Sequence, residues 1–311
     1  MKHPLFRVAA GLGLLCVVFA AASHAQPPPT APVESGTRVP DSAAPAPLRV
    51  AFWNIQWFPG GHPHASSRAE ERQIQAVQAE VPTLAADLIG FQEVRDWDSA
   101  ALAVQTLPGF KVDVCSNFPP RAGQDVSQQV AITSRLQPIS AWAEPWKSGG
   151  VIHPPRGFAF ASYELSPHQI LLVYAVHLKS NLGELVENVA LREESIRQLI
   201  AHMHEMETAY QKLGDLTWIV GGDFNTAPDD VRFRTEKSIP LLLKYGFSWS
   251  WENTPFDRRM TRPPTKEYPA ACFDHIFYRG ARLQNAEVLS TSAVASDHRA
   301  VRAEFDFPTA R

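Results

Sequence analysis

Short apolar runs and longer segments with helical spacing alternate along the chain from residue 49 onward. Apolar residues three and four positions apart predict helices over residues 69–84 and 186–206. Short runs of apolar residues, bounded by polar residues or turns, predict strands. The predicted strands are residues 49–55, 88–92, 130–133, 158–164, 170–176, 218–220, 273–278 and 301–307. The folded region is therefore expected to contain both strands and helices throughout.

Polar residues of types that can take part in catalysis lie at or near the ends of several of these apolar strands. They are Asn54, Glu93, His177, Asp223 and Asp274. Strand ends on a rigid sheet can converge on one pocket, while the connecting loops shape it. The strand ends therefore predict one polar site.

The N-terminal segment has the pattern of a signal peptide. Lys2 and Arg7 give a short positive region, and an almost unbroken apolar run over residues 8–22 follows. That run is short for a membrane span, and Ser23 and Ala25 supply small residues at the cleavage positions. We therefore predict a signal peptide over residues 1–25 and an exported protein, periplasmic or secreted. The alternative is an uncleaved anchor; after cleavage no stable membrane insertion is expected.

Residues 26–47 are rich in Pro, Ala, Thr and Ser. Such a segment has too little apolar surface to offset the entropy of ordering it, and its prolines favour extended chain. We predict a disordered linker here and a folded catalytic domain over residues 48–308. That length suits one large sandwich with one core.

The net charge limits the kind of partner. Removing the signal peptide takes away two basic residues, so the charge moves from -3 to -5, with 27 basic and 32 acidic residues. Proteins that coat nucleic acid through many phosphate contacts are usually clearly positive. The charge argues against that class, but not against a nuclease that holds its substrate briefly through a metal and a few arginines.

The mature chain has two cysteines, Cys115 and Cys272. They could pair in an oxidising compartment, or remain as two buried thiols. The sequence leaves both alternatives open, because it does not give the distance between them.

Six short motifs occur in one order across the chain. They are Trp53-Asn54-Ile55, Gln92-Glu93, His177-Leu178-Lys179, Gly222-Asp223-Phe224-Asn225, Asp274-His275-Ile276 and Ser296-Asp297-His298. Each is weak alone, because an isolated Asp after Gly-Gly, for example, is usually a turn residue. Together they resemble the endonuclease/exonuclease/phosphatase superfamily, and residues 92–96 are especially similar to deoxyribonucleases. The resemblance implies an α+β fold, a four-layer α/β/β/α sandwich with two packed, mostly antiparallel sheets.

The resemblance also implies a metal site. It makes Glu93 the principal ligand, with Asn54 and Asp297 completing or supporting the shell. Oxygen ligands of this kind suit Mg²⁺, with Mn²⁺ or Ca²⁺ as alternatives. Zinc is disfavoured, since the mature chain has no multi-cysteine cluster. The implied activity is that of a Mg²⁺-dependent phosphoric ester hydrolase.

The remaining motif residues have roles that follow from phosphodiester chemistry. Hydrolysis needs a Lewis acid, a base for water and charge relief for the leaving oxygen. By resemblance, Asp223 activates or positions the water, and Asn225 orients it or the phosphate. His177 and His298 donate hydrogen bonds to the phosphate or protonate the leaving group. Asp274 is expected to fix the tautomer of one of these histidines, with the partner left open.

Further basic and aromatic residues have two interpretations each. Arg156 is a candidate phosphate-binding residue by resemblance to deoxyribonuclease-like relatives, or else a surface arginine. A second group interleaves aromatics with arginines and either binds bases and phosphates or forms core beside a basic loop. Its members are Trp249, Trp251, Phe256, Arg258, Arg259 and Arg262. His275 is expected to point away from Asp274 and to be structural.

The motifs favour an exported nuclease that hydrolyses phosphodiester bonds of DNA or RNA, with nucleic acid as its substrate. The alternative is a phosphodiesterase or phosphatase acting on a phospholipid or sugar phosphate, sphingomyelinase-like or inositol-phosphatase-like. A non-catalytic binding module is a third reading, and retention of every candidate catalytic residue argues against it. Substrate choice, and endo or exo action, depend on the loops.

Overall fold

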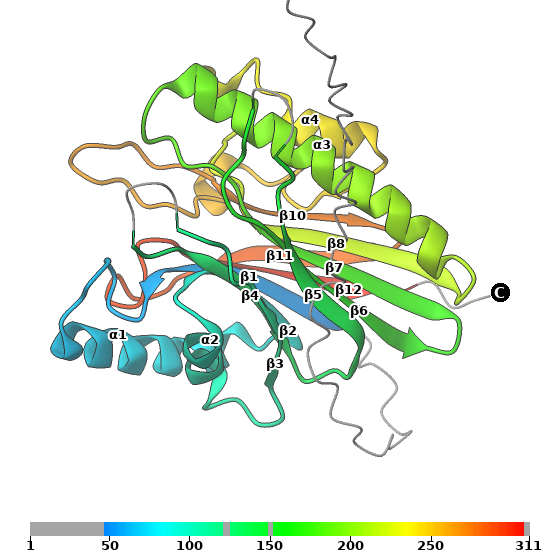
Figure 1. Ribbon diagram of the computed structural model, residues 1–311, viewed down its shortest axis with the longest axis horizontal. Helices are drawn as coiled ribbons and strands as arrows, with labels where there is room; N and C mark the ends of the chain where they lie inside the picture. The colour runs from blue at the N-terminus through cyan, green and yellow to red at the C-terminus, as the bar shows by residue number, and fades with distance from the viewer. Residues whose placement is uncertain (1–46, 121–124, 149–151, 308–311) are drawn as a thin grey trace, which may run out of the picture. The chain divides into compact units, whose positions relative to one another are not determined.

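The computed structural model describes residues 47–120, 125–148 and 152–307, and within them two β-sheets pack face to face (Figure 1). The predicted signal peptide and residues 26–46 of the predicted linker lie outside the described residues. Among the helices that are described, none is long and apolar enough to cross a membrane.

The first sheet has six strands in the order β11-β12-β1-β2-β4-β3. Their bounds are β1 Leu48–Phe58, β2 Leu88–Val94, β3 Lys111–Cys115, β4 Gln129–Ser134, β11 Arg282–Leu289 and β12 Ala300–Asp306. β1 and β2 run parallel, and the other neighbours are antiparallel. The C-terminal strand β12 therefore pairs with the first strand of the domain.

The second sheet also has six strands, in the order β5-β6-β7-β8-β10-β9. Their bounds are β5 Pro138–Pro145, β6 Gly157–Ser166, β7 Gln169–His177, β8 Asp215–Asp223, β9 Ser248–Trp249 and β10 Asp274–Arg279. Only β7 and β8 are parallel within this described sheet. Both strands consequently end at the same edge.

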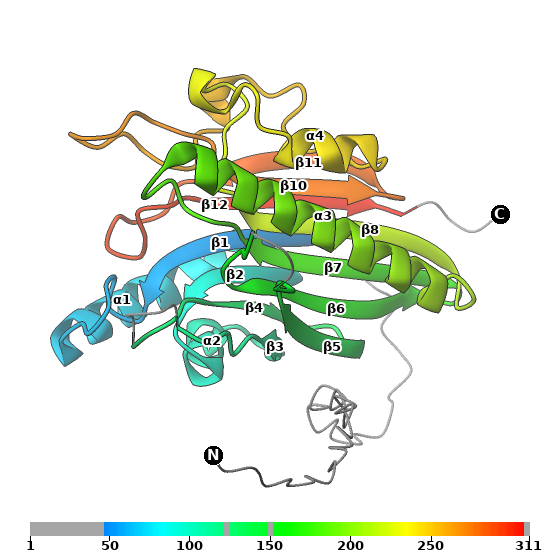
Figure 2. The same ribbon diagram turned by 45° about the horizontal axis from the view of Figure 1, so that its top comes forward.

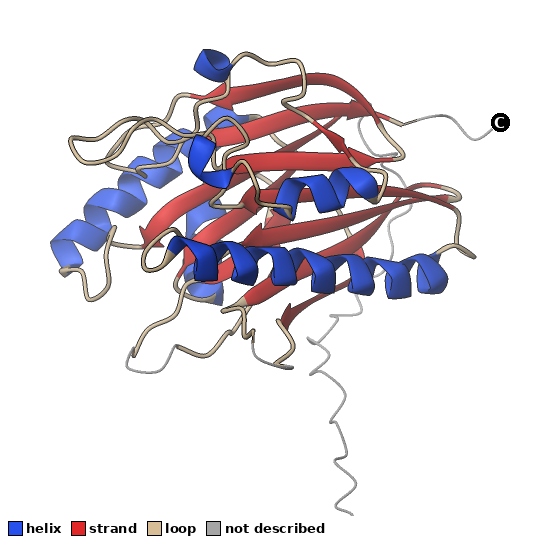
Figure 3. Ribbon diagram, turned by 90° about the horizontal axis from the view of Figure 1, so that it is seen from above, coloured by secondary structure: helices blue, strands red, loops and turns tan. Residues whose placement is uncertain are grey.

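Helices cover the outer face of each sheet, as Figures 2 and 3 show. α1 (Ser67–Glu80) and α2 (Trp97–Val104) lie on the first sheet, and α3 (Leu185–Tyr210) and α4 (Ser238–Lys244) on the second. Short 3₁₀ turns occur at η1 (Val81–Leu84), η2 (Val231–Phe233) and η3 (Phe256–Arg258). The four-layer sandwich with mostly antiparallel sheets is thus confirmed.

A large inner core fills the space between the sheets, and Phe52 is one of its fully buried members. A Cβ at Gly90 of β2 or at Gly221 of β8 would come within 2.4 Å or 2.3 Å of the Phe52 ring. Contacts this short are sterically forbidden, so both strands need glycine where they pass the ring. This packing fixes the separation of the two sheets close to the predicted site.

Cys115 and Cys272 are free thiols in the structure. Cys115 lies on β3 of the first sheet, and Cys272 lies just before β10 of the second. Of the two alternatives that the sequence left open, the structure shows the unpaired one.

Asp113 lies on β3, the edge strand of the first sheet, and provides a test of the packing there. Its Oδ2 accepts a hydrogen bond from Tyr163 Oη at 2.6 Å, and burial raises its pKa from 3.8 to about 6. The folded state therefore binds more protons than the unfolded state between these values and loses stability as the pH rises through them. We expect Asp113→Asn to gain about 1–3 kcal/mol in free energy of unfolding, relative to wild type, between pH 4 and pH 7.

Urea denaturation of both proteins at the two pH values measures this difference. The exposed Asp257→Asn variant is the matched control and should show no such pH-dependent gain. The raised pKa would be contradicted if the free energy of unfolding of Asp113→Asn differed from that of wild type by the same amount at pH 4 and at pH 7.

Candidate active site

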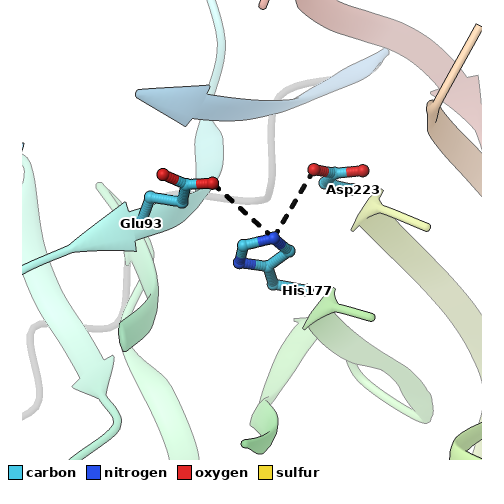
Figure 4. A group of neighbouring side chains, drawn as sticks. All are labelled: Glu93, His177 and Asp223. Carbon is cyan, nitrogen blue, oxygen red and sulfur yellow. Dashed lines mark ion pairs between the residues drawn. The ribbon is translucent and has the colours of Figure 1, made fainter. Parts of the chain in front are cut away.

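Three of the predicted site residues meet where β2, β7 and β8 end (Figure 4). His177 pairs in register with Asp223, because β7 and β8 are parallel neighbours. His177 Nε2 lies 3.7 Å from Glu93 Oε1 and 3.6 Å from Asp223 Oδ2. The imidazole nitrogen thus sits between a carboxylate of the first sheet and a carboxylate of the second.

Asn54 on β1 joins the same two carboxylates. Its Nδ2 donates to Glu93 Oε1 and to Asp223 Oδ2, each at 3.0 Å, while its Oδ1 accepts from Gln56 N. Trp57 N donates to the other oxygen of Glu93 at 3.1 Å. The predicted ligand Asn54 therefore presents its amide nitrogen, and not its oxygen, to the acidic cluster, and it holds the carboxylates together.

Backbone strain is concentrated around this cluster. Five non-glycine residues that line the pocket have positive φ angles: Gln56, Trp57, Glu93, Arg156 and Asn225. Such conformations are uncommon for these residue types and persist only where the surroundings fix them. In β1 and β2 they coincide with irregular pairing between Asn54 and Phe58. No motif or apolar pattern in the chain predicts this strain.

The histidine that Asp274 pairs with is His298. His298 Nδ1 lies 2.8 Å from Asp274 Oδ2, and both side chains are almost fully buried. The other ring nitrogen, Nε2, lies 3.9 Å from Asp223 Oδ2. A carboxylate on Nδ1 fixes the tautomer and orientation of the ring, so that Nε2 is directed into the site.

The Ser296-Asp297-His298 motif is held against β1. Ser296 Oγ donates to Asn54 O at 2.6 Å and accepts from His298 N at 3.0 Å. Trp53 Nε1 donates to His298 O at 3.0 Å. The loop that carries His298 is thereby fixed to the strand that carries Asn54.

Asp297 lies at the rim of the pocket. Its carboxylate is 33% exposed, and Oδ2 forms an ion pair with Arg262 Nη2 at 2.7 Å. The described groups whose ligand atoms lie within 4.8 Å of one another are Glu93, His177 and Asp223, and Asp223, Asp274 and His298. Of the three predicted metal ligands, the structure therefore places Glu93 in such a group, and Asn54 and Asp297 beside it.

Asp223 and Asn225 form one turn at the end of β8. Asn225 N donates to Asp223 Oδ1 at 2.8 Å, and Asn225 Nδ2 donates to Leu178 O at 3.2 Å. A Cβ at Gly222 would fall 2.1 Å from Val176 O, and its φ of +130° also requires glycine. The Gly-Asp-x-Asn motif thus allows β8 to approach β7 closely and directs Asp223 toward His177.

Burial dominates the electrostatics of the acids. Burial raises the pKa of Glu93, although the hydrogen bond from Asn54 opposes this. Burial also raises the pKa of Asp223 to about 7, with Asp274 adding to the effect and His298 opposing it. For His298, burial alone would lower the pKa, but the carboxylates of Asp274 and Asp223 outweigh it and raise the pKa.

The donor set fits a divalent cation. Two buried carboxylates with raised pKa values are costly to ionise together unless positive charge is brought close to them. Glu93 and Asp223 supply hard oxygen ligands of the kind that Mg²⁺ and Mn²⁺ prefer. A cation between them would favour the ionised state of both carboxylates.

Arg156 lines the pocket and supports its main chain. Its guanidinium donates to His177 O at 2.9 Å, to Leu178 O at 2.5 Å and to Gln128 Oε1 at 3.1 Å. Contact with substrate phosphate remains a prediction for Arg156. The structure adds a role in holding the end of β7.

The stretch of aromatics and arginines is divided between core and surface, with Trp251 and Arg259 buried and Phe256 and Arg258 exposed. Trp251 is fully buried, and Arg259 lies over the Trp249 ring at 5.0 Å and pairs with Asp229 at 2.7 Å. Among the arginines of this group, only Arg262 lines the pocket in the described structure. Sequence reasoning had placed it in a group without giving it a role of its own.

His275 points away from the cluster, as expected from strand alternation. Its Nε2 bonds Thr226 O at 2.9 Å, and its Nδ1 accepts from Trp249 Nε1 at 3.2 Å. Burial lowers its pKa to about 4, which keeps the ring neutral. These contacts are those of a structural histidine.

The cluster lies in a pocket of about 910 Å³. Besides the site residues, its wall includes Lys179, Arg232, Arg262 and Tyr268, together with several prolines of the surrounding loops. The acids and imidazoles are therefore accessible from a space whose wall also includes basic residues.

The fold and the site together define a hydrolase class with acids, imidazoles and a cation-binding cluster at one edge of a two-sheet sandwich. Residues 51–298 match the model of the Endonuclease/Exonuclease/phosphatase family, and the chain belongs to this family. The family is one of phosphoester hydrolases that depend on a divalent metal, and the acids and imidazoles of this chain's site fit that chemistry.

One curated relative is the UPF0294 protein VV2535 of Vibrio vulnificus (strain YJ016), 27% identical over 168 residues. That match covers 53% of this chain and 48% of the relative, so the chain matches about half of that protein's length.

Similar solved structures agree on the fold. The human Nocturnin catalytic domain with bound sulfate has a TM-score of 0.63 at 17% identity, covering 84% of this chain and 95% of that one. D. rerio TDP2 complexed with single strand DNA product has a TM-score of 0.59 at 15% identity, covering 84% and 100%. The mannosyl-6-phosphatase Bt3783 of Bacteroides thetaiotaomicron VPI-5482 has a TM-score of 0.60 at 18% identity, again covering 84% and 100%.

Proposed function

We propose that the protein is an exported, Mg²⁺-dependent phosphodiesterase that cleaves nucleic acid. The observation that carries this is the group Glu93, His177 and Asp223, joined through Asp223 to the Asp274–His298 pair in one open pocket. The similarity of residues 92–96 to deoxyribonucleases and the basic residues of the pocket wall support a polyanionic substrate. The structure of TDP2 with a DNA product supports it at the level of fold.

Glu93 would hold the metal ion, with the carboxylate of Asp223 close to it. When bound, a divalent cation polarises a phosphoryl oxygen and offsets the charge that repels the nucleophile. Asn54 keeps the two carboxylates in place through its amide nitrogen. His177 Nε2 faces the space between these carboxylates, where its N–H would donate to a phosphate oxygen.

Asp223 and His298 carry the proton transfers. Asp223, which the nearby cation would keep ionised, takes a proton from water as the water oxygen forms its bond to phosphorus. The ester P–O bond breaks with its electron pair on the leaving oxygen. His298, whose pKa is raised, gives its Nε2 proton to that oxygen. Asp274 holds the ring for this step.

The direct test is cleavage of supercoiled plasmid and of single-stranded DNA and RNA by the mature protein with Mg²⁺, beside bis(4-nitrophenyl) phosphate. Cleavage of nucleic acid supports the full proposal. Hydrolysis of the chromogenic diester alone removes nucleic acid as substrate and favours a phospholipid or sugar phosphate. N-terminal sequencing of the protein from periplasm or medium tests export, and a chain beginning at Gln26 is expected.

Asp274→Asn is expected to lower kcat about 10- to 100-fold with little change in KM. The variant keeps the shape of the side chain. It removes the negative charge that orients His298 and favours its protonated state. An NMR titration of His298 should show a lower pKa in the variant. Unchanged kcat together with an unchanged pKa would contradict the role of the pair.

A further inference from the structure

Arg262 lines the pocket and contacts both Asp297 and His298. Its Nη2 is 2.7 Å from Asp297 Oδ2, and its Nη1 is 3.2 Å from His298 Nε2. The side chain lines the pocket and is 30% exposed. One guanidinium therefore contacts both an acid and the imidazole of the Ser-Asp-His motif, with part of its surface open to a substrate.

The main chain holds Arg262 at this place. Thr261 Oγ1 accepts from Phe273 N at 2.9 Å and from Asp274 N at 3.1 Å, and Thr261 O accepts from Arg299 N at 2.8 Å. Arg262 itself forms a bridge with Ala271. Thr261, the residue before Arg262, is thus hydrogen-bonded to the main chain of Asp274 and of Arg299, the residue after His298.

The other cations of the pocket have different contacts. Arg156 donates to main-chain oxygens at the end of β7, and Lys179 donates to main-chain oxygens of its own loop. Arg232 binds Asp230 within its own turn. Arg262, by its printed geometry, contacts the acid and the imidazole of the Ser-Asp-His motif directly.

We propose that Arg262 binds a non-bridging oxygen of the scissile phosphate, beside His298; this rests on the proposed phosphodiesterase function. Asp274 occupies Nδ1 of His298, so Nε2 faces Arg262 and the pocket. A neutral ring accepts from Arg262 there, and a protonated ring donates beside it to a shared acceptor. A guanidinium has five N–H groups, so the two observed contacts leave others for a phosphate oxygen.

The test compares wild type with Arg262→Met and Arg262→Lys, using the mature protein with Mg²⁺. Hydrolysis of bis(4-nitrophenyl) phosphate and its inhibition by inorganic phosphate are measured, and phosphate binding is followed separately by calorimetry. Losing a charge-assisted hydrogen bond should lower kcat/KM and weaken phosphate binding by about 10- to 100-fold each. Arg262→Lys should recover part of both. Arg258→Met, at an exposed arginine four residues earlier, is the matched control and should change neither.

The outcomes separate the two proposals. Arg262→Met values within twofold of wild type would overturn the assignment, as would lost activity with unchanged phosphate binding, which indicates a role through Asp297 alone. If wild type hydrolyses no phosphoester with any divalent metal, the proposed function fails. Calorimetry with inorganic phosphate then still decides whether Arg262 holds an anion.

Discussion

Asp223→Asn should lower kcat on a phosphodiester by about 10²- to 10⁴-fold, the range expected for removal of a general base. The change keeps the size of the side chain and removes the carboxylate that takes the proton from water. Asp223 is almost fully buried, and its pKa of about 7 shows that its charge is costly in the folded protein. Removing that charge offsets the disturbed contact with Asn54 Nδ2, so the melting temperature of the metal-free variant should stay within a few degrees of wild type.

Steady-state kinetics on bis(4-nitrophenyl) phosphate and a thermal melt of each protein make this test. Asp257→Asn changes the same residue type at an exposed position and should leave both readings unchanged. A variant that keeps more than a tenth of wild-type kcat would remove Asp223 from the proposed chemistry. A variant that has lost its folded structure would be replaced by Asp223→Ser for the same comparison.

Metal removal is the second large effect that we expect. Chelation by EDTA should abolish hydrolysis and Mg²⁺ should restore it, because the cation supplies several kcal/mol of charge stabilisation. Glu93→Gln should lose most of the response to Mg²⁺ while keeping an oxygen that can accept from Asn54 or from the main chain. Ten-millimolar Mg²⁺ should stabilise wild type by about 2.7 kcal/mol if this is 100 times its Kd, and should stabilise the variant much less.

The melting shift caused by Mg²⁺ is a readout that does not need activity. Burial raises the pKa values of Glu93 and Asp223, so protons compete with the metal and the shift should shrink as the pH falls below about 7. Glu71→Gln, at an exposed position of α1, should behave as wild type. Full hydrolysis in excess EDTA, with no Mg²⁺-dependent shift at any pH, would rule out a metal site here.

The sequence was informative about the fold where elements are long or buried. The predicted helix over 186–206 is within α3, and the predicted strands all fall within strands of the two sheets, apart from a residue or so at their ends. The predicted helix over 69–84 is interrupted after Glu80, where the 3₁₀ turn Val81–Leu84 begins with Pro82 in its first positions. The apolar pattern did not predict the remaining elements, which are α2, α4, β3, β5, β9 and β11. β9 is only two residues long, and β11 has mostly exposed or half-buried residues, so its apolar pattern is weak.

For the site, the residue types were visible in the sequence and their contacts were not. The motifs pointed to Glu93, His177, Asp223 and His298, which the fold does bring together. The partner of Asp274 and the orientation of the Asn54 amide depend on side-chain geometry across two sheets, which no local pattern encodes. Arg262 was seen only as one of several arginines, because its contact with His298 joins positions 36 apart in the chain.

The pairing of β12 with β1 makes the candidate site depend on two strands that are far apart in the chain. β1 gains its second neighbour only after residues 300–306 have been made, and His298 enters the site in the loop just before them. A chain that has been synthesised only as far as β10 therefore has Glu93, His177 and Asp223, but it lacks His298 and the strand that pairs with the free edge of β1. The complete set of site residues is therefore expected to assemble only after residues 298–306 have been made.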